Sequence, residues 1–124
     1  MESIGLVIVS HSKHIAEGVV ELISKVAKDV PITYVGGTEG GGIGTSFDQV
    51  DRVVSENPAD TLLAFFDLGS AKMNLKIVTD FSDKSIIINR VPIVEGAYNA
   101  AALLQAGAEL SVIQTQLAEL EINK

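Results

Sequence analysis

The first strand-length segment of the chain constrains the fold more than any other feature. Residues 4–9 read Ile-Gly-Leu-Val-Ile-Val, an almost unbroken apolar run that stops at Ser10 and is followed by His11. Continuous rather than alternating hydrophobicity is typical of a strand covered on both faces, as in a parallel sheet between two layers of helices. In such sheets, ligands bind beyond the carboxyl ends of the strands. His11 is therefore the first candidate for a functional side chain.

Three more apolar segments, at residues 32–35, 61–66 and 85–88, are predicted strands, and helical patterns follow all four. The alternation predicts a doubly wound α/β fold with a four-stranded, mainly parallel sheet in the order 2-1-3-4 and helices on both faces. Apolar residues at helical spacing are expected to face the core: Ile15, Val19, Leu22, Ile23 and Val26; Phe47, Val50, Val53 and Val54; Met73, Ile77, Val78 and Phe81; Leu110, Ile113, Leu117 and Leu120.

Local signals place several helix boundaries. Ser12 is the expected N-cap of the first helix, and Ser46 with Gln49 fits a capping box for the second. The Ala- and Leu-rich segment 97–105 is a strong helix former, and Ala-Gly-Ala at 106–108 is expected to separate it from the last helix.

Length and composition favour one domain over residues 1–124 with a well-buried core, because 47% of the residues are hydrophobic. No apolar stretch approaches the roughly 18 residues of a membrane span, and Met1-Glu2-Ser3 has no basic residue that would suggest a signal peptide. Cysteine is absent, which excludes disulfides and thiolate metal sites and is compatible with a cytoplasmic location. The net charge of −7 and the lack of tryptophan argue against a nucleic-acid partner.

The predicted strand order brings two polar residues together. His11 follows the first strand and Asp67 follows the third, and in the order 2-1-3-4 these strands are neighbours at the switch point of the sheet. A carboxylate that accepts the proton of one ring nitrogen leaves a free lone pair on the other. The pair could serve as a general base for a serine, or His11 could act as the nucleophile itself.

A glycine-rich loop favours the second use. Residues 36–46 hold six of the eleven glycines of the chain, and closely spaced glycines allow backbone N–H groups to converge on an anion. The loop lacks the lysine of a Walker motif and follows the second strand rather than the first, so direct binding of ATP or NAD is disfavoured.

Simpler structural roles compete with these functions. Asp67 could cap the helix that follows it, Arg90 could form a surface ion pair, and the glycine loop could be flexible, a lid or a docking surface. His14, three residues after His11, is expected to be an exposed structural residue.

Four motifs at the strand ends together resemble a known family. They are Val7–Ser12, Gly40–Ser46, Asp67–Ser70 and Pro92–Ala97. They are similar to the phosphotransferase subunits of phosphoenolpyruvate-dependent dihydroxyacetone kinases, the DhaM family, which are related to mannose-type IIA domains of the bacterial sugar phosphotransferase system. The resemblance covers essentially the whole chain.

This resemblance implies that His11 is a phosphohistidine nucleophile oriented by Asp67. His11 would accept a phosphoryl group from the phosphocarrier HPr and pass it to ADP on the nucleotide-binding kinase subunit, in the pathway of glycerol metabolism. No metal or cofactor is expected on this chain, since ADP, ATP and Mg would belong to the partner subunit. Family members are typically homodimers, and a chain ending at Lys124 would depend on separate phosphocarriers. Residues expected to contact phosphate or a partner are Ser12, Gly40, Gly41, Gly42, Gly44, Thr45, Gly69, Ser70 and Arg90.

Three alternatives remain open. The first is a mannose-type IIA domain that donates phosphate to a sugar-permease IIB domain. The second is a response-regulator receiver phosphorylated on Asp67, although Ser10-His11 stands where a receiver has its acidic pair for Mg²⁺. The third is a non-catalytic module in which His11 binds a partner without covalent chemistry.

Overall fold

The computed structural model describes residues 3–124, and it contains the parallel sheet that the apolar segments predict. The strands are β1 (Ile4–Ser10), β2 (Ile32–Gly36), β3 (Thr61–Phe66) and β4 (Ser85–Asn89). All three strand pairings are parallel, and the order β2-β1-β3-β4 confirms the prediction. Met1 and Glu2, which entered the expectation about a signal peptide, lie outside the described residues.

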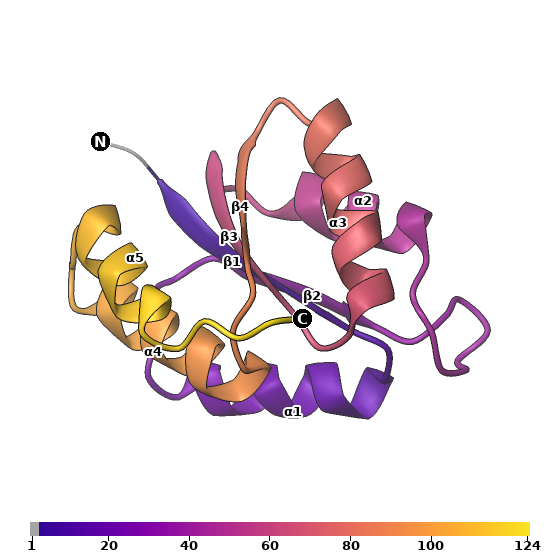
Figure 1. Cartoon of the computed structure of the whole chain (residues 1–124), viewed down its shortest axis with the longest axis horizontal. Helices are drawn as coiled ribbons and strands as arrows, with labels where there is room; N and C mark the ends of the chain where they lie inside the picture. The colour runs from indigo at the N-terminus through magenta and orange to yellow at the C-terminus, as the bar shows by residue number, and fades with distance from the viewer. Residues whose placement is uncertain (1–2) are drawn as a thin grey trace.

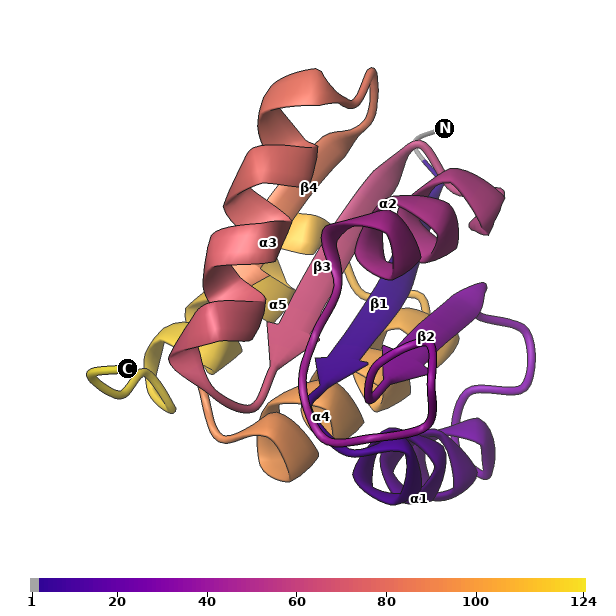
Figure 2. The same ribbon diagram turned by 90° about the vertical axis from the view of Figure 1, so that its right-hand side faces the viewer.

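Helices cover both faces of the sheet, as Figures 1 and 2 show. One face carries α1 (Lys13–Ser24), α4 (Ile93–Gln105) and α5 (Leu110–Ala118), and the other carries α2 (Phe47–Glu56) and α3 (Gly69–Phe81). Strand side chains alternate between the two resulting cores, because successive residues of a strand point to opposite faces. The first core holds Leu6, Ile8, Leu63 and Phe65, and the second holds Val7, Val9, Leu62, Ala64 and Phe66.

Three predicted helix faces are partly wrong. In α1 the buried residues are Ala16, Val19 and Ile23, whereas Ile15 and Leu22 are about half exposed. A small residue is needed where α1 meets the sheet, because a Cβ on Gly36 would lie 2.8 Å from the Ala16 Cβ. The spacing of the large apolar residues therefore predicts the wrong rotation of α1 about its own axis.

The error is larger in α3. Its buried stripe is Ala71, Leu75 and Val78, at the spacing i, i+4 and i+7. Met73, Ile77 and Phe81 were expected to face the core, yet they are 63%, 43% and 79% exposed. These three side chains, here called the outer face of α3, form an apolar stripe turned away from the sheet. In α2, Val50, Val53 and Val54 are buried as predicted, but Phe47 is exposed at 36%.

One helix start and one capping box also differ from expectation. The helix predicted from residue 97 begins four residues earlier, directly after Pro92, so that Gly96 lies inside α4. A side chain there would collide with Val91, since a Cβ on Gly96 would lie 2.2 Å from the Val91 Cγ2. At α2 the Ser46 hydroxyl accepts from the Gln49 N–H as predicted. The buried Gln49 Oε1 has no hydrogen-bond partner among residues 3–124, so the reciprocal bond of a capping box is not made there.

No helix within residues 3–124 has both the length and the apolar character needed to cross a lipid bilayer.

A substitution at Gly36 tests the close approach of β2 to α1. A Cβ at this position would lie 2.4 Å from the Ser12 carbonyl oxygen and 2.8 Å from the Lys13 Cα. We expect Gly36→Ala to lower the free energy of unfolding by about 1–3 kcal/mol, because backbone must move to admit the methyl group. Urea denaturation measures this change.

Gly18 supplies the matched control. Gly18 lies in α1, the helix that Gly36 approaches, and a Cβ added to Gly18 would meet nothing within 4 Å. Gly18→Ala should therefore stabilise the protein by about 0.5–1 kcal/mol. Equal effects of the two substitutions would contradict the packing described for Gly36.

Candidate active site

His11 and Asp67 are in direct contact at the carboxyl end of the sheet. His11 is the first residue after β1, Asp67 is the first after β3, and the two strands are paired side by side. The His11 Nδ1 lies 2.8 Å from the Asp67 Oδ1, and the two side chains are only 15% and 13% exposed. The contact predicted from the strand order is therefore confirmed.

The Asp67 carboxylate accepts hydrogen bonds on both oxygens. Oδ2 receives the Ser10 hydroxyl at 2.7 Å and the His11 backbone N–H at 2.9 Å. Oδ1 receives the His11 ring and the Leu68 backbone N–H at 2.8 and 2.7 Å. The N-cap position of α3 is Leu68, which makes no side-chain cap bond, so Asp67 is directed at His11 rather than serving as the N-cap.

These contacts determine the charge of Asp67. Burial of the carboxyl acts to raise its pKa, but hydrogen bonds from the backbone and ring of His11, from Ser10 and from Leu68 favour the ionised form. Together they hold the pKa of Asp67 below its usual value of 3.8. Asp67 is thus a carboxylate at neutral pH.

An ionised carboxylate only accepts hydrogen bonds, so the proton between the two residues belongs to the His11 Nδ1. The other ring nitrogen, Nε2, then carries the lone pair. It makes a short hydrogen bond with the Ser70 hydroxyl, which must be the donor in this tautomer. The site therefore presents a nucleophilic nitrogen whose orientation is fixed from the opposite side of the ring.

Ser70 comes from the first turn of α3, which begins at Gly69. The first N–H groups of a helix have no partner within it and form the positive end of its dipole. Such a helix start favours a phosphoryl group or another anion. Of the two residues predicted here to contact phosphate or a partner, Ser70 thus contacts the His11 Nε2, and Gly69 precedes it as the first residue of α3.

The glycine loop has a different arrangement from the predicted cradle. The N–H groups of Gly41, Gly42 and Gly44 donate to the Thr38 carbonyl, the Thr38 hydroxyl and the His11 carbonyl, respectively. The bond from Gly44 to His11 is 2.9 Å long and fixes the loop to the residue that follows β1. These three donors are used inside the protein, so α3 is the better source of N–H groups for an anion.

The loop is also attached to α3. The Thr45 hydroxyl accepts from the Asn74 side chain at 2.8 Å. Gly37, Gly41 and Gly44 have φ angles of 77°, 87° and 141°, a region that favours glycine. The predicted residues Gly40 and Gly41 are exposed in this loop.

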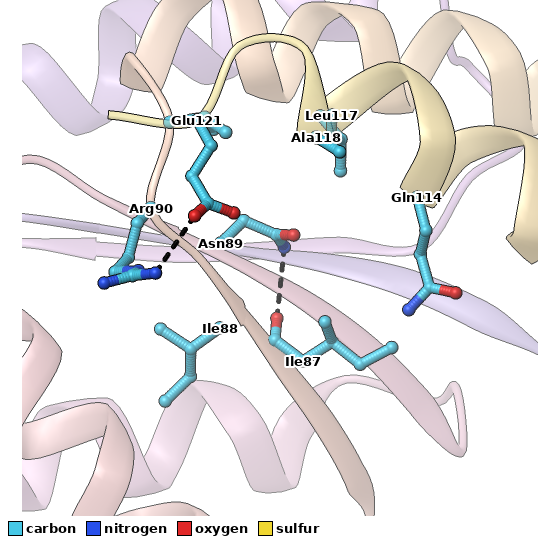
Figure 3. Close-up of a pocket in the computed structure, with 9 residues that line it drawn as sticks. Ile87, Ile88, Asn89, Arg90, Gln114, Leu117, Ala118 and Glu121 are labelled. Carbon is cyan, nitrogen blue, oxygen red and sulfur yellow. Dashed lines mark hydrogen bonds and ion pairs between the residues drawn. The ribbon is translucent and has the colours of Figure 1, made fainter. Parts of the chain in front are cut away.

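Arg90 lies at the end of β4, where its guanidinium is paired with Glu121 at 3.0 Å. Figure 3 shows the pair beside a hollow of about 260 Å³ between β4 and α5. The surface ion pair considered for Arg90 is therefore present, and its role toward phosphate or a partner stays a prediction.

Ser12 caps α1 by accepting from the Ile15 N–H, and the His14 side chain is 93% exposed.

Two residues of the site were missed by sequence reasoning. Ser10 is 1% exposed and links Asp67 to the start of α1, because its hydroxyl donates to the carboxylate and accepts from the Ser12 N–H. A serine ending an otherwise apolar strand was the available signal. The second residue is Lys124, whose ammonium donates to the Phe66 carbonyl at 2.6 Å, and no local pattern points to it.

Within residues 3–124, no cluster of three or more histidine, aspartate or glutamate side chains is arranged to hold a metal.

Comparisons with known proteins agree on one family. A family model described as the PTS system fructose IIA component, EIIA-man, matches residues 5–114. The phosphotransferase subunit DhaM of the PTS-dependent dihydroxyacetone kinase of Lactococcus lactis is 54% identical over 120 residues, covering 97% of this chain and 98% of that protein. The phosphoryl donor subunit DhaM of PEP-dependent dihydroxyacetone kinase 1 of Listeria innocua is 50% identical, covering 95% of each chain. The resemblance drawn from the four motifs is confirmed.

Some relatives are longer. A phosphoryl donor subunit DhaM from Providencia stuartii is 32% identical over 119 residues, which cover 89% of this chain but 25% of that protein. Among solved structures, the protein of unknown function EF1359 aligns with a TM-score of 0.84 at 26% identity, over 98% of this chain and 97% of that one. A sigma-54 interaction domain protein from Enterococcus faecalis aligns with a TM-score of 0.73 at 10% identity, over 95% and 90% of the two chains, which supports the fold alone.

The pKa of Asp67 predicts how stability depends on pH. A carboxyl whose pKa is depressed by folding stabilises the folded state above its unfolded pKa, and this contribution is lost as the pH falls through the folded pKa. The difference in unfolding free energy between the native chain and Asp67→Asn should be largest above about pH 5 and shrink below about pH 4. Urea titrations across this range measure it. A difference that grows on acidification would contradict the assigned hydrogen bonds.

Proposed function

The chain belongs to the EIIA-man family of phosphotransferase-system IIA components, and we propose that it is the phosphoryl donor subunit of a phosphoenolpyruvate-dependent dihydroxyacetone kinase. The observation that supports the chemistry is the line of contacts from Asp67 through His11 to Ser70 at the start of α3. It leaves a single ring nitrogen, the His11 Nε2, available to form a bond to phosphorus beside an anion-binding helix end.

In the first step His11 is phosphorylated. The lone pair of Nε2 attacks the phosphorus of phosphorylated HPr in line with the bond that breaks, and the electron pair of that bond remains on the donor. The proton stays on Nδ1, where the Asp67 carboxylate stabilises the positive charge that develops on the ring. The Ser70 hydroxyl turns from Nε2 to an oxygen of the arriving phosphoryl group.

In the second step His11 is the leaving group. An oxygen of the β-phosphate of ADP, bound to the nucleotide-binding kinase subunit, attacks the phosphorus. The bond from Nε2 to phosphorus breaks, its electrons return to the ring, and neutral His11 is restored. ATP forms on the partner and is used there to phosphorylate dihydroxyacetone. The nucleotide and Mg belong to that subunit, and this chain contributes no cofactor. We place this activity in the cytoplasm, as part of glycerol metabolism.

A hydrolytic reaction with a serine nucleophile fits the same contacts less well. Serine, histidine and aspartate in this order resemble a hydrolytic triad, with Ser70 as the nucleophile. Neither His11 nor Ser70 lines any of three hollows found within residues 3–124, so none of these hollows offers the pair an acyl pocket. Phosphorylation of Asp67, as in a receiver, is disfavoured because both of its oxygens already accept hydrogen bonds.

We also propose that the chain forms a homodimer. β4 is an edge strand of the sheet, and the neighbouring outer face of α3 exposes Met73, Ile77 and Phe81. An unpaired strand edge beside an exposed apolar stripe favours association, and a second copy presents the same surface across a two-fold axis.

Phosphoryl labelling tests the nucleophile. With labelled phosphoenolpyruvate, enzyme I and HPr, the native chain should take up label that is lost in acid and stable in alkali. His11→Ala should take up none, whereas His14→Ala, the control at an exposed histidine, should be labelled normally. Asp67→Ala should slow uptake by roughly 10- to 100-fold without unfolding the chain, since only orientation and charge are lost.

Each outcome separates the alternatives. Acid-labile label on His11→Ala would contradict the proposal, and alkali-labile label would indicate an acyl phosphate on a carboxylate. Transfer of the label to a sugar-permease IIB domain, with none to ADP on the kinase subunit, would favour the IIA alternative. Covalent labelling of Ser70 by a fluorophosphonate would favour the hydrolase.

Association is tested on the outer face of α3. Phe81→Asp places a charge on the most exposed side chain of this face and should convert a dimer to a monomer, with half the mass by light scattering. Leu22→Asp is the control, because Leu22 is 52% exposed on α1, across the sheet from α3. A native chain that is monomeric at all concentrations, or a Phe81→Asp variant that stays dimeric, would contradict this surface.

A further inference from the structure

The segment after α5 returns to the active site. The Ile122 N–H donates to the Arg90 carbonyl at 2.9 Å, and the Lys72 ammonium of α3 donates to the Lys124 carbonyl at 2.9 Å. These two contacts direct the last described residues across the carboxyl ends of β4 and β3. Figures 1 and 2 show the segment ending beside the turn from β3 to α3.

The side chain of Lys124 makes two contacts with a single residue. Its ammonium donates to the Phe66 carbonyl at 2.6 Å and lies 4.3 Å from the centre of the Phe66 ring. Phe66 is the last residue of β3 and directly precedes Asp67. A hydrogen bond and a cation–π contact on a fully buried phenylalanine hold the cation in place, one residue from the carboxylate.

The other charged groups around Lys124 have separate partners. From α3, the Lys72 ammonium is directed at the Lys124 carbonyl. From the end of β4, Arg90 is paired with Glu121 of the same segment as Lys124. From the end of β1, His11 is bonded to Asp67. Burial lowers the pKa of Lys124, and the charge of Asp67, the residue after the Phe66 that holds the ammonium, acts in the opposite direction.

We propose that Lys124 is a positioning residue for phosphoryl transfer, whose ammonium keeps Asp67 ionised so that the ring proton stays on the His11 Nδ1. This inference rests on the proposed function and adds to it a residue outside the four motifs. It assigns a role to the segment after α5, which otherwise only covers the strand ends.

The location of the ring proton matters in the second step. While Nδ1 keeps its proton, breaking the bond from Nε2 to phosphorus returns the electron pair to a ring that ends neutral. If Asp67 took that proton, the same step would expel an anionic imidazolate, a much poorer leaving group. A cation beside the carboxylate lowers its affinity for the proton, so it favours the first path. Lys124 acts through Asp67 and does not itself contact the phosphoryl group in this account.

The test begins with the unphosphorylated chain. Titration of the Asp67 carboxyl by carbon-detected NMR should give a higher pKa in Lys124→Gln than in the native chain, and a native-like value in Lys124→Arg. Lys76→Gln, which removes the same charge from an exposed position of α3, is the control and should leave Asp67 unchanged. Transfer of phosphoryl from His11 to ADP should be roughly two- to fivefold slower in Lys124→Gln and restored in Lys124→Arg, the size expected of one partly solvated charge.

An Asp67 titration that does not move in Lys124→Gln, or that moves equally in Lys76→Gln, would overturn the role of Lys124. Failure of arginine to restore the transfer rate would do the same, since a charge effect must be rescued by another cation. The titration needs no phosphoryl donor, so it is independent of the proposed function. A native chain that takes up no label contradicts the kinase role, whereas an unmoved Asp67 contradicts only the part assigned to Lys124.

Discussion

The site depends on one partly buried carboxylate whose two oxygens both accept hydrogen bonds. Asp67 accepts from Ser10, from the backbone and ring of His11, and from Leu68, so segments from β1 and β3 converge on its two oxygens. A parallel sheet makes this possible, because the carboxyl ends of neighbouring strands lie at the same edge and their following turns face each other. The pairing of Val9 with Phe66 sets the register that brings Ser10 level with Asp67 and leaves His11 one residue further on, within reach of the carboxylate. The ionised carboxylate then determines which nitrogen of His11 keeps its proton and which is free to react.

The features that the sequence predicts correctly are those that depend on hydrophobic periodicity and on the order of the strands. The unbroken apolar runs predicted parallel strands, and the commonest order for four of them placed His11 beside Asp67. The rotation of the helices was harder to predict, since apolar residues in α3 recur along two stripes and only packing selects between them. Leu75 faces the sheet, while Ile77 and Phe81 face outward. An apolar residue on a helix can therefore belong to an exposed surface instead of the core.

Other parts of the site arise from contacts between residues far apart in the sequence. Lys124 reaches Phe66 across 58 positions, and nothing in its own neighbourhood predicts that contact. In the glycine loop, by contrast, a clear local pattern was present but the contacts differ from those it suggested. Its composition suggested a phosphate cradle, but Gly41, Gly42 and Gly44 use their N–H groups within the protein, and α3 supplies the helix start beside the His11 Nε2. Glycines here allow turns with positive φ and attach the loop to His11.

We propose that Asp67 orients His11 so that Nε2 alone takes the phosphoryl group. The most direct test is NMR of the phosphorylated chain with ¹⁵N-labelled histidine, in which coupling between phosphorus and nitrogen identifies the bonded ring atom. We expect one phosphorylated residue, His11, with phosphorus on Nε2 and a proton on Nδ1 that remains hydrogen-bonded to Asp67. Phosphorus on Nδ1, or on any residue other than His11, would contradict it.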